Sequence, residues 1–447
     1  MTTTTDTIAA IATANGVGSI AIVRISGDAA EKIASLVTKK ESFKPRHATL
    51  SNIYNAKDEL IDEAIVLLFK GPYSFTGEDV VEFQCHGGSV VAQSILKTVL
   101  HYGARLAEPG EFSKRAFFNG RIDLSEAEAI AKLIEAKSED AAKVLARQIK
   151  GELREFIEEV REEIIHILAY SEVSIDYAEE DLPDDIIEQM VQKMNTLIAS
   201  LQRTLQASKS REGLMQGFKV AIVGKPNVGK SSLLNALLHY ERAIVSDIAG
   251  TTRDTIEEQV RIGSHLIRIV DTAGIREASD EIERIGIERS KEAIEQSDIV
   301  IALFDASKEA DEEDKKILKL VEEFVGEKKV LYVKNKIDLP QRLNLNIEFD
   351  VAINAKESVD ALVEKLEEIL DTTNTSQEVM LISTRQIHAV ESAIGYIKEA
   401  FLPLEEGELE IFSFCLNQAI KELGSITRPF ENDEMLDKMF SSFCLGK

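Results

Sequence analysis

Apolar residues recur with two different periods along this chain, and the two periods divide it into segments. In the first 120 residues or so, short runs rich in Val, Ile and Phe lie between Gly, Pro and Asp, which is typical of β-strands. The predicted strands are Ile20–Ser26, Ala48–Tyr54, Ile61–Phe69 and Val80–Cys85, and helical spacing predicts one helix, Ser89–His101. This mixture predicts an α+β domain.

From Leu124 onward the period is that of long, acidic, amphipathic helices. The predicted helices are Leu124–Ser138, Glu139–Tyr170 and Asp184–Ser210, the last of them preceded by Pro183. The same pattern returns over Glu378–Lys447, after a polar linker at Asp371–Gln377. We therefore expect one helical domain made of two separate segments.

Between these helical segments the pattern changes again, to short apolar strands that alternate with helices. The predicted strands are Lys219–Val223, Glu257–Ile262, Leu266–Val270, Asp298–Asp305, Lys329–Lys334 and Phe349–Ile353. The predicted helices are Ser231–Leu238, Glu283–Gln296, Glu312–Glu327 and Ser358–Leu370. Such alternation predicts a doubly wound α/β domain with a mostly parallel sheet, inserted into the helical domain.

Length and composition agree with a protein of several domains. The chain has 447 residues, of which 44% are hydrophobic and 29% charged, so two or three globular domains are expected. Its apolar runs are strand-sized, as in Ile299–Phe304, and fall well short of the ~18 residues of a membrane helix. Thr2–Thr5 are not a basic signal-peptide region, so we expect a cytoplasmic protein without a membrane anchor.

Cysteine usage and charge narrow the possible functions. Cys85, Cys415 and Cys444 lie far apart, which argues against a disulfide framework or a common zinc site. The net charge is −26, whereas binding to RNA phosphates requires basic surface. If RNA is the substrate, a local basic patch or a partner must supply the contact.

One glycine-rich segment carries a specific chemical signal. Gly224–Ser231 (GKPNVGKS) fits the pattern G-x-x-x-x-G-K-[ST], after a predicted strand and before a predicted helix. In that context backbone N–H groups surround phosphates at the helix N-terminus. Lys230 is expected to neutralise the β- and γ-phosphates, and the Ser231 hydroxyl to bind magnesium.

Two further motifs at strand ends predict a magnesium-side contact and the identity of the nucleotide base. Asp271–Gly274 (DTAG) fits the second, magnesium-side motif, and Asp271 is expected to act through a water molecule. Asn335–Asp338 (NKID) places a carboxylate that can accept two hydrogen bonds from guanine, a pair that adenine lacks, with discrimination of about 10⁴. Ala355 and Lys356 are expected to support the base. The sequence therefore predicts a GTP-hydrolysing protein.

The residue after Asp271–Gly274 departs from a common catalytic arrangement. Many GTPases have glutamine there to orient the attacking water, but this chain has Ile275. Another group must take that role, and the acids of Ile275–Arg284 are all candidates on the residues alone.

Nine further stretches accompany these motifs: Arg24–Gly27 (RISG), Ser74–Asp79 (SFTGED), His86–Gly88, Pro109–Phe112, Arg115–Phe117, Asp247–Asp254 (DIAGTTRD), Asp271–Arg276, Glu283–Glu288 (ERIGIE) and Phe443–Lys447 (FCLGK). In this combination the chain resembles, over its whole length, the tRNA modification GTPase MnmE (TrmE) family. The C-terminal motif beside a P-loop is the most specific of them.

The resemblance implies a domain order and a function. The expected domains are an N-terminal tetrahydrofolate-binding and dimerisation domain (1–120), two helical segments (121–215 and 372–447) and a G domain (216–371). Family members form homodimers and act with the flavoprotein MnmG on tRNA. Together they add a carboxymethylaminomethyl group at C5 of the wobble uridine, with 5-formyltetrahydrofolate as one-carbon donor.

The resemblance also implies roles for individual residues. Glu283 corresponds to the water-positioning acid, and potassium-dependent pairing of G domains would activate hydrolysis. Magnesium would bind Ser231 and Thr252, potassium would bind Asn227, Ser246, Ile248 and Thr251, and folate would bind Arg24, Glu82, Arg121 and Lys447. The implied GTP contacts are Asn227, Val228, Gly229, Lys230, Ser231, Ser232, Ser246, Asp247, Ile248, Ala249, Gly250, Thr251, Thr252, Asp271, Thr272, Ala273, Gly274, Asn335, Lys336, Asp338, Ala355 and Lys356.

A few positions depart from the family pattern, and two other functions compete. Asn354 stands where Ser is usual, Arg121 where Lys is common, Leu445 where Ile is usual, and Arg428 where Gly is typical. Cys444 is either a buried apolar residue or a reactive thiol. A ribosome-assembly GTPase would need a basic RNA-binding domain, and a folate-dependent transferase would use GTP only for regulation.

Overall fold

The computed structural model describes most of the chain and divides it into two compact units. Described residues are 6–14, 16–136, 138–176, 186–210, 212–240, 258–270, 283–345, 347, 349–351, 353, 355–372, 379–428, 433–441, 443 and 446. The first unit comprises residues 1–134, 148–194 and 392–447, and the second comprises 135–147 and 195–391. The division passes through two long helices, α7 (Ile186–Ser210) and α14 (Thr384–Glu399).

The first unit contains a mixed six-stranded sheet in the order β3-β4-β5-β2-β1-β6. All neighbouring pairs are antiparallel except β1 and β6. The strands are β1 (Ile8–Ile11), β2 (Ile20–Ser26), β3 (Thr49–Tyr54), β4 (Leu60–Phe69), β5 (Val80–His86) and β6 (Arg105–Leu106). The predicted strands of this region are thus confirmed, and β1 and β6 are added to them.

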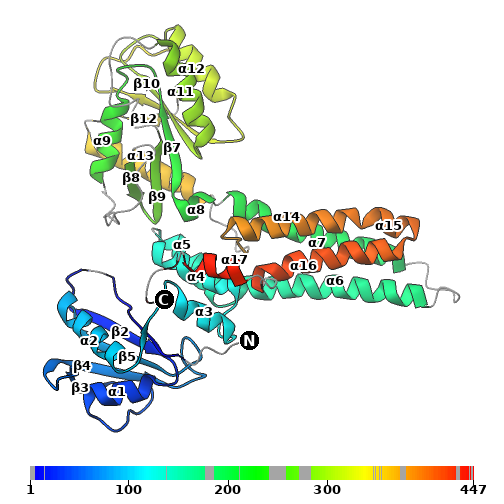
Figure 1. Ribbon diagram of the computed structural model, residues 1–447. Coiled ribbons are helices and arrows are strands. Elements are labelled where there is room, and N and C mark those ends of the chain that lie inside the picture. The colour runs from blue at the N-terminus through cyan, green and yellow to red at the C-terminus, as the bar shows by residue number, and fades with distance from the viewer. Residues whose placement is uncertain are drawn as a thin grey trace. The chain divides into compact units, whose positions relative to one another are not determined.

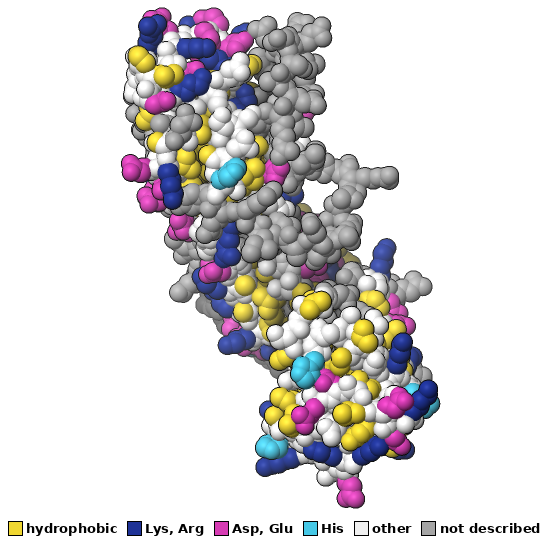
Figure 2. Space-filling model, turned by 90° about the vertical axis from the view of Figure 1, so that its left-hand side faces the viewer, with side chains coloured by type: hydrophobic (Ala, Val, Ile, Leu, Met, Phe, Trp, Pro, Cys, Tyr) yellow, Lys and Arg dark blue, Asp and Glu magenta, His cyan; other side chains and the backbone are white. Residues whose placement is uncertain are grey.

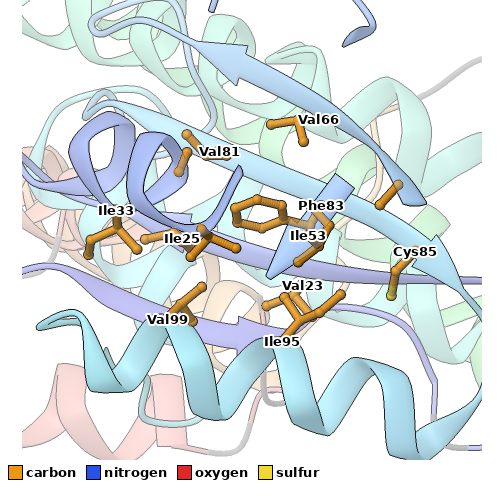
Figure 3. Close-up of a cluster of buried hydrophobic side chains, with 14 of the residues drawn as sticks. Val23, Ile25, Ile33, Ile53, Val66, Val81, Phe83, Cys85, Ile95 and Val99 are labelled. Atoms are coloured by element: carbon orange, nitrogen blue, oxygen red, sulfur yellow. The ribbon is translucent and has the colours of Figure 1, made fainter. Parts of the chain in front are cut away.

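Two helices, α1 (Ala30–Thr38) and α2 (Ser89–His101), pack on one face of this sheet. Figure 3 shows the core between them, where Val23 and Ile25 of β2 and Phe83 of β5 meet Ile33 of α1 and Val99 of α2. All five side chains are at most 1% exposed. Because successive strand residues point to opposite faces, the residues between these core positions are turned toward the other face of the sheet.

The rest of the first unit is helical. Its helices are α3 (Glu111–Phe118), α4 (Leu124–Glu135), α6 (Glu152–Asp176), α15 (Phe401–Glu406), α16 (Leu409–Thr427) and α17 (Asp433–Ser441). Helices α6 and α16 run side by side (Figure 1). Arg428 ends α16 in an extended conformation, and its N–H donates to the carbonyl of Gly424 at 2.9 Å.

The prediction of one helix over Glu139–Tyr170 is wrong. The structure has two helices, α5 (Glu139–Ile149) and α6, separated at Gly151. Gly151 has φ of +94°, which a helix residue cannot adopt and which other residue types rarely adopt. The apolar period continues on both sides of this glycine, so periodicity alone did not show the break.

The second unit contains the α/β sheet, in the order β12-β11-β10-β7-β9-β8. Its strands are β7 (Phe218–Val223), β8 (Glu258–Ile262), β9 (His265–Val270), β10 (Ile299–Asp305), β11 (Lys329–Asn335) and β12 (Phe349–Asp350). Only β8 is antiparallel to its neighbour. The associated helices are α8 (Glu212–Gln216), α9 (Lys230–Tyr240), α11 (Glu283–Gln296), α12 (Glu312–Glu322) and α13 (Lys356–Thr372).

This topology confirms the predicted fold class: an α+β domain, helical segments and a doubly wound α/β domain. Central strand β10 is buried along its whole length, as expected for a parallel strand covered on both faces. Among the described residues, the helices include none long and apolar enough to cross a membrane.

Candidate functional site

The glycine-rich segment Gly224–Ser231 forms a tight loop between β7 and α9. Asn227 has φ of +64°, in the left-handed region, and Gly229 has φ of +107°. A Cβ atom on Gly229 would lie 2.3 Å from the side-chain nitrogen of Asn335, so a larger residue would displace that side chain. The loop therefore has the close backbone path that a phosphate-binding loop requires.

Lys230 is the first residue of α9, and its side chain turns back into the loop. Its Nζ donates to the carbonyl oxygens of Gly224 at 2.6 Å and Lys225 at 2.9 Å. Burial lowers the pKa of Lys230, because desolvation disfavours the charged form. Ser231 and Ser232 follow in the first turn of α9, where both are exposed.

The segment Asn335–Asp338 lies directly against this loop. Asn335 ends β11, and its Nδ2 donates to the carbonyl of Val228 at 2.8 Å. Lys336 donates from Nζ to the carbonyl of Asn227, also at 2.8 Å. Asp338 is exposed in the turn that follows. The structure thus brings together two predicted motifs that are about a hundred residues apart in the sequence.

Ala355 and Lys356 belong to the same end of the sheet. The backbone N–H of Ile353 donates to Oδ1 of Asn335 at 3.4 Å, which fixes the strand end that precedes them. Ala355 is exposed just before α13, and its carbonyl accepts from Ser358 at 3.1 Å. Asn335 thus contacts both the loop before α9, at Val228, and the strand end that precedes Ala355.

Other predicted nucleotide and cation contacts lie outside the described residues. These are Ser246, Asp247, Ile248, Ala249, Gly250, Thr251, Thr252, Asp271, Thr272, Ala273 and Gly274. Glu283 begins α11, but its side chain also falls outside the described part of the chain.

A second candidate site lies in the first unit, on the sheet face opposite α1 and α2. Arg24 of β2 is paired in register with Glu82 of β5, and its Nη2 lies 2.8 Å from Glu82 Oε1. The guanidinium carbon is 5.8 Å from the ring centre of Phe75 and 5.7 Å from that of Phe112. Its Nη1 donates to the carbonyl of Gly446 at 3.3 Å.

These contacts place a cation near two aromatic rings, with one carboxylate to hold it. Arg121 lies close to this site, because its Nε donates at 3.1 Å to the carbonyl of Ser74, the residue before Phe75. Lys447 and Cys444 lie outside the described residues. Phe75 and Phe112 fall within the SFTGED and PGEF stretches, although the sequence did not identify the rings themselves as site residues.

The charged surface is mixed in sign. On the face that Figure 2 shows, basic and acidic side chains of the described residues are interspersed, without a broad basic area. The described part of this face therefore lacks the broad basic area that binding RNA mainly through phosphates would require.

Comparisons with known proteins match nearly the whole chain. The profile of the "GTP-binding protein TrmE N-terminus" matches residues 7–121, and that of the "MnmE helical domain" matches residues 124–444. The chain is 72% identical over 443 residues to the tRNA modification GTPase MnmE of Sulfurimonas denitrificans, covering 99% of each. It is 60% identical to the protein of that name from Aliarcobacter butzleri, again with 99% of each covered.

Proposed function

This chain belongs to the MnmE family of tRNA modification GTPases, and on that premise we propose a function for each of its two candidate sites. The loop Gly224–Ser231 takes the phosphates of GTP, Asp338 takes the guanine base, and water attacks the γ-phosphate. Together with the flavoprotein MnmG, the protein adds a carboxymethylaminomethyl group to C5 of the wobble uridine in certain tRNAs.

One observation supports the nucleotide site above the others. Asn335 and Lys336 bind the loop carbonyls of Val228 and Asn227, both at 2.8 Å. These two bonds fix the distance between the proposed base-binding segment, Asn335–Asp338, and the proposed phosphate-binding loop, Gly224–Ser231. A site that recognises a whole nucleotide needs such a fixed distance. Adenine at Asp338 would leave the carboxylate without its two donors, which favours guanine.

Two cations complete the proposed GTP site. Ser231 would hold magnesium, together with Thr252, and its exposed position on the first turn of α9 suits this role. Asn227 would bind potassium, together with Ser246, Ile248 and Thr251. Asn227 is exposed, and its left-handed backbone lies in the loop itself. A cation there supplies positive charge beside the phosphates.

Glu283 would orient the attacking water, because Ile275 has no group that can. We propose an N-terminal domain of residues 1–120, followed by a helical domain in two segments, 121–215 and 372–447, with the G domain inserted between these segments at 216–371. Potassium would bring the G domains of two chains together, and this pairing would activate hydrolysis.

The Arg24 site would bind 5-formyltetrahydrofolate. Folates carry a planar heteroaromatic ring and carboxylates, and the Arg24 guanidinium near Phe75 and Phe112 offers both stacking surface and positive charge. Glu82, Arg121 and Lys447 would be its further ligands. Arg121 keeps the positive charge of the lysine common at its position.

An exposed apolar sheet face supports the proposed homodimer. Leu50 of β3 is 59% exposed and lies in register with Ile65 of β4, which is 38% exposed. Ile20 of β2, on the same sheet, is 61% exposed. A second copy of the chain would remove these side chains from water. MnmG would join this dimer in a heterotetramer, in the cytoplasm where tRNA is found.

Two experiments test the proposal. Nucleosides from the tRNA of cells that lack this protein should show unmodified wobble uridine by mass spectrometry; normal modification would refute the tRNA function. Purified protein should hydrolyse GTP much faster in potassium than in sodium at equal ionic strength. Equal rates would refute the potassium mechanism and leave the GTPase activity itself untouched.

A further inference from the structure

The last residue of β10 is a buried aspartate whose two oxygens are both used. The Asp305 side chain is 2% exposed. Its Oδ2 accepts from Lys336 Nζ at 2.7 Å, and its Oδ1 accepts from the N–H of Ser307 at 3.0 Å and the hydroxyl of Ser307 at 2.6 Å. The carboxylate therefore has a fixed orientation, and one of its oxygens is committed to a lysine.

Strand register explains why these two residues meet. Strands β10 and β11 are parallel, and Asp305 lies opposite Asn335. The next backbone bond, from the N–H of Ala306 to the carbonyl of Asn335 at 2.8 Å, keeps the strand ends together. Lys336 then turns with φ of +65°. This turn brings its ammonium group over the buried carboxylate.

Lys336 in turn connects Asp305 with the phosphate loop. The same Nζ that binds Asp305 donates to the carbonyl of Asn227 at 2.8 Å. A lysine side chain loses rotamer freedom when it is fixed, and this loss costs free energy. A buried counter-charge offsets that cost before any nucleotide binds, so the lysine is already placed.

We propose that Asp305 is a positioning residue for guanine-nucleotide binding. It holds Lys336 against Asn227 and so fixes the spacing between the loop for the phosphates and the segment for the base. The inference rests on the proposed guanine site at Asp338. It adds a residue that belongs to none of the sequence motifs and that acts only through Lys336.

The Asp305→Asn variant tests this role with little change in shape. It keeps one oxygen but removes the charge that holds Lys336. We expect the dissociation constants for the fluorescent analogues mant-GDP and mant-GTP, and the KM for GTP, to rise about tenfold, which corresponds to about 1.4 kcal/mol. The kcat at saturating GTP should stay within about twofold of the parent value. The reason is that the spacing between the phosphate loop and the base-binding segment affects nucleotide binding and not the attack of water.

Asp298, an exposed aspartate that directly precedes β10, provides a control. Its Oδ2 accepts from the backbone N–H of Lys219 at 2.8 Å, so it is also an aspartate that fixes one strand to another. Asp298→Asn should leave both the dissociation constants and the KM unchanged. If both variants lower the melting temperature alike and neither changes nucleotide affinity, Asp305 is only structural and the inference is wrong.

A second variant shows whether Asp305 acts through the lysine. Lys336→Met keeps an unbranched apolar chain and lacks the ammonium group, so it should raise the same constants by a similar factor. Adding Asp305→Asn to it should change them no further; fully additive effects would overturn the inference. Equal affinity of the parent protein for GDP and ADP would instead refute the guanine site itself.

Discussion

Lys225, the second residue of the phosphate loop, lies with its Nζ 2.5 Å from Oδ2 of Asp314 on α12. The two side chains are 9% and 2% exposed. Asp311 also accepts from Lys225, at 2.7 Å, and caps the N-terminus of α12 through a capping box with Asp314. A buried ion pair thus joins the loop to the helix that follows β10.

The first prediction concerns the loss of Lys225. Lys225→Met leaves the carboxylate of Asp314 buried without its cation, which should lower the free energy of unfolding by about 3–5 kcal/mol. Urea unfolding followed by circular dichroism measures this change. Lys315→Met on α12 removes an exposed pair with Glu312 and should leave the free energy of unfolding nearly unchanged. Equal losses in the two variants would contradict the role given to the buried pair.

The second prediction concerns acid. The hydrogen bond from Lys225 lowers the pKa of Asp311 from 3.8 to about 2. A lowered carboxylate pKa stabilises the fold above pH 3.8, and this stabilisation is lost as pH falls toward 2. Because the side chain is 54% exposed, screening reduces the contribution to about 1 kcal/mol. Between pH 5 and pH 2.5, Asp311→Asn should therefore lose less stability to urea than the parent protein; identical pH profiles would exclude the effect.

The third prediction concerns the proposed water-positioning acid. Glu283→Ala should reduce kcat for GTP by at least about hundredfold while the dissociation constant for mant-GTP stays nearly unchanged. Glu292→Ala, an exposed acid on the same helix, is the control and should hydrolyse GTP at the parent rate. A Glu283 variant as fast as the parent protein would remove that residue from the mechanism.

The fourth prediction concerns the Arg24 site. Arg24→Ala should weaken binding of 5-formyltetrahydrofolate at least about tenfold in titration calorimetry, because the positive charge near the two rings is lost. Arg46→Ala, which removes an exposed arginine of the same domain, should bind folate as the parent does. GTP hydrolysis should continue in both variants. Unchanged folate affinity after Arg24→Ala would mean that the ligand binds elsewhere.

The fifth prediction concerns thiol reactivity. Cys85 is 2% exposed, and burial raises its pKa to about 11; burial also raises the pKa of Cys415, which is 7% exposed. Neither should react with iodoacetamide at pH 8, since the thiolate is the reactive form. If Cys444 is the reactive thiol, peptide mass spectrometry should find about one label per chain, at that residue. A native protein without label would show that Cys444 is buried or inert.

Local patterns predicted much of this fold because local physics determines it. Alternation of apolar residues gave strands β2 and β5, and the motif GKPNVGKS predicted the loop before α9. Short elements were missed: α1 has nine residues and β1 only four, so their periods are too brief to distinguish from loops.

Contacts between distant segments could not be predicted in this way. Asp305 and Lys336 are 31 residues apart and Lys225 and Asp314 are 89 apart, so only the folded sheet shows that they meet. The rings of Phe75 and Phe112 lay within motifs that the sequence did identify. Their proximity to Arg24 depends on how strand β2 packs against the segments that carry the rings, and it could not be predicted from the spacing of these residues in the sequence.

The bond between Arg24 and the carbonyl of Gly446 spans 422 residues. During synthesis, Arg24 therefore leaves the ribosome long before the residue that supplies this carbonyl. The interval includes the whole nucleotide-binding domain, which must emerge first. An isolated fragment of residues 1–134 would thus carry Arg24 and Glu82 without the backbone oxygen of Gly446 that Arg24 binds.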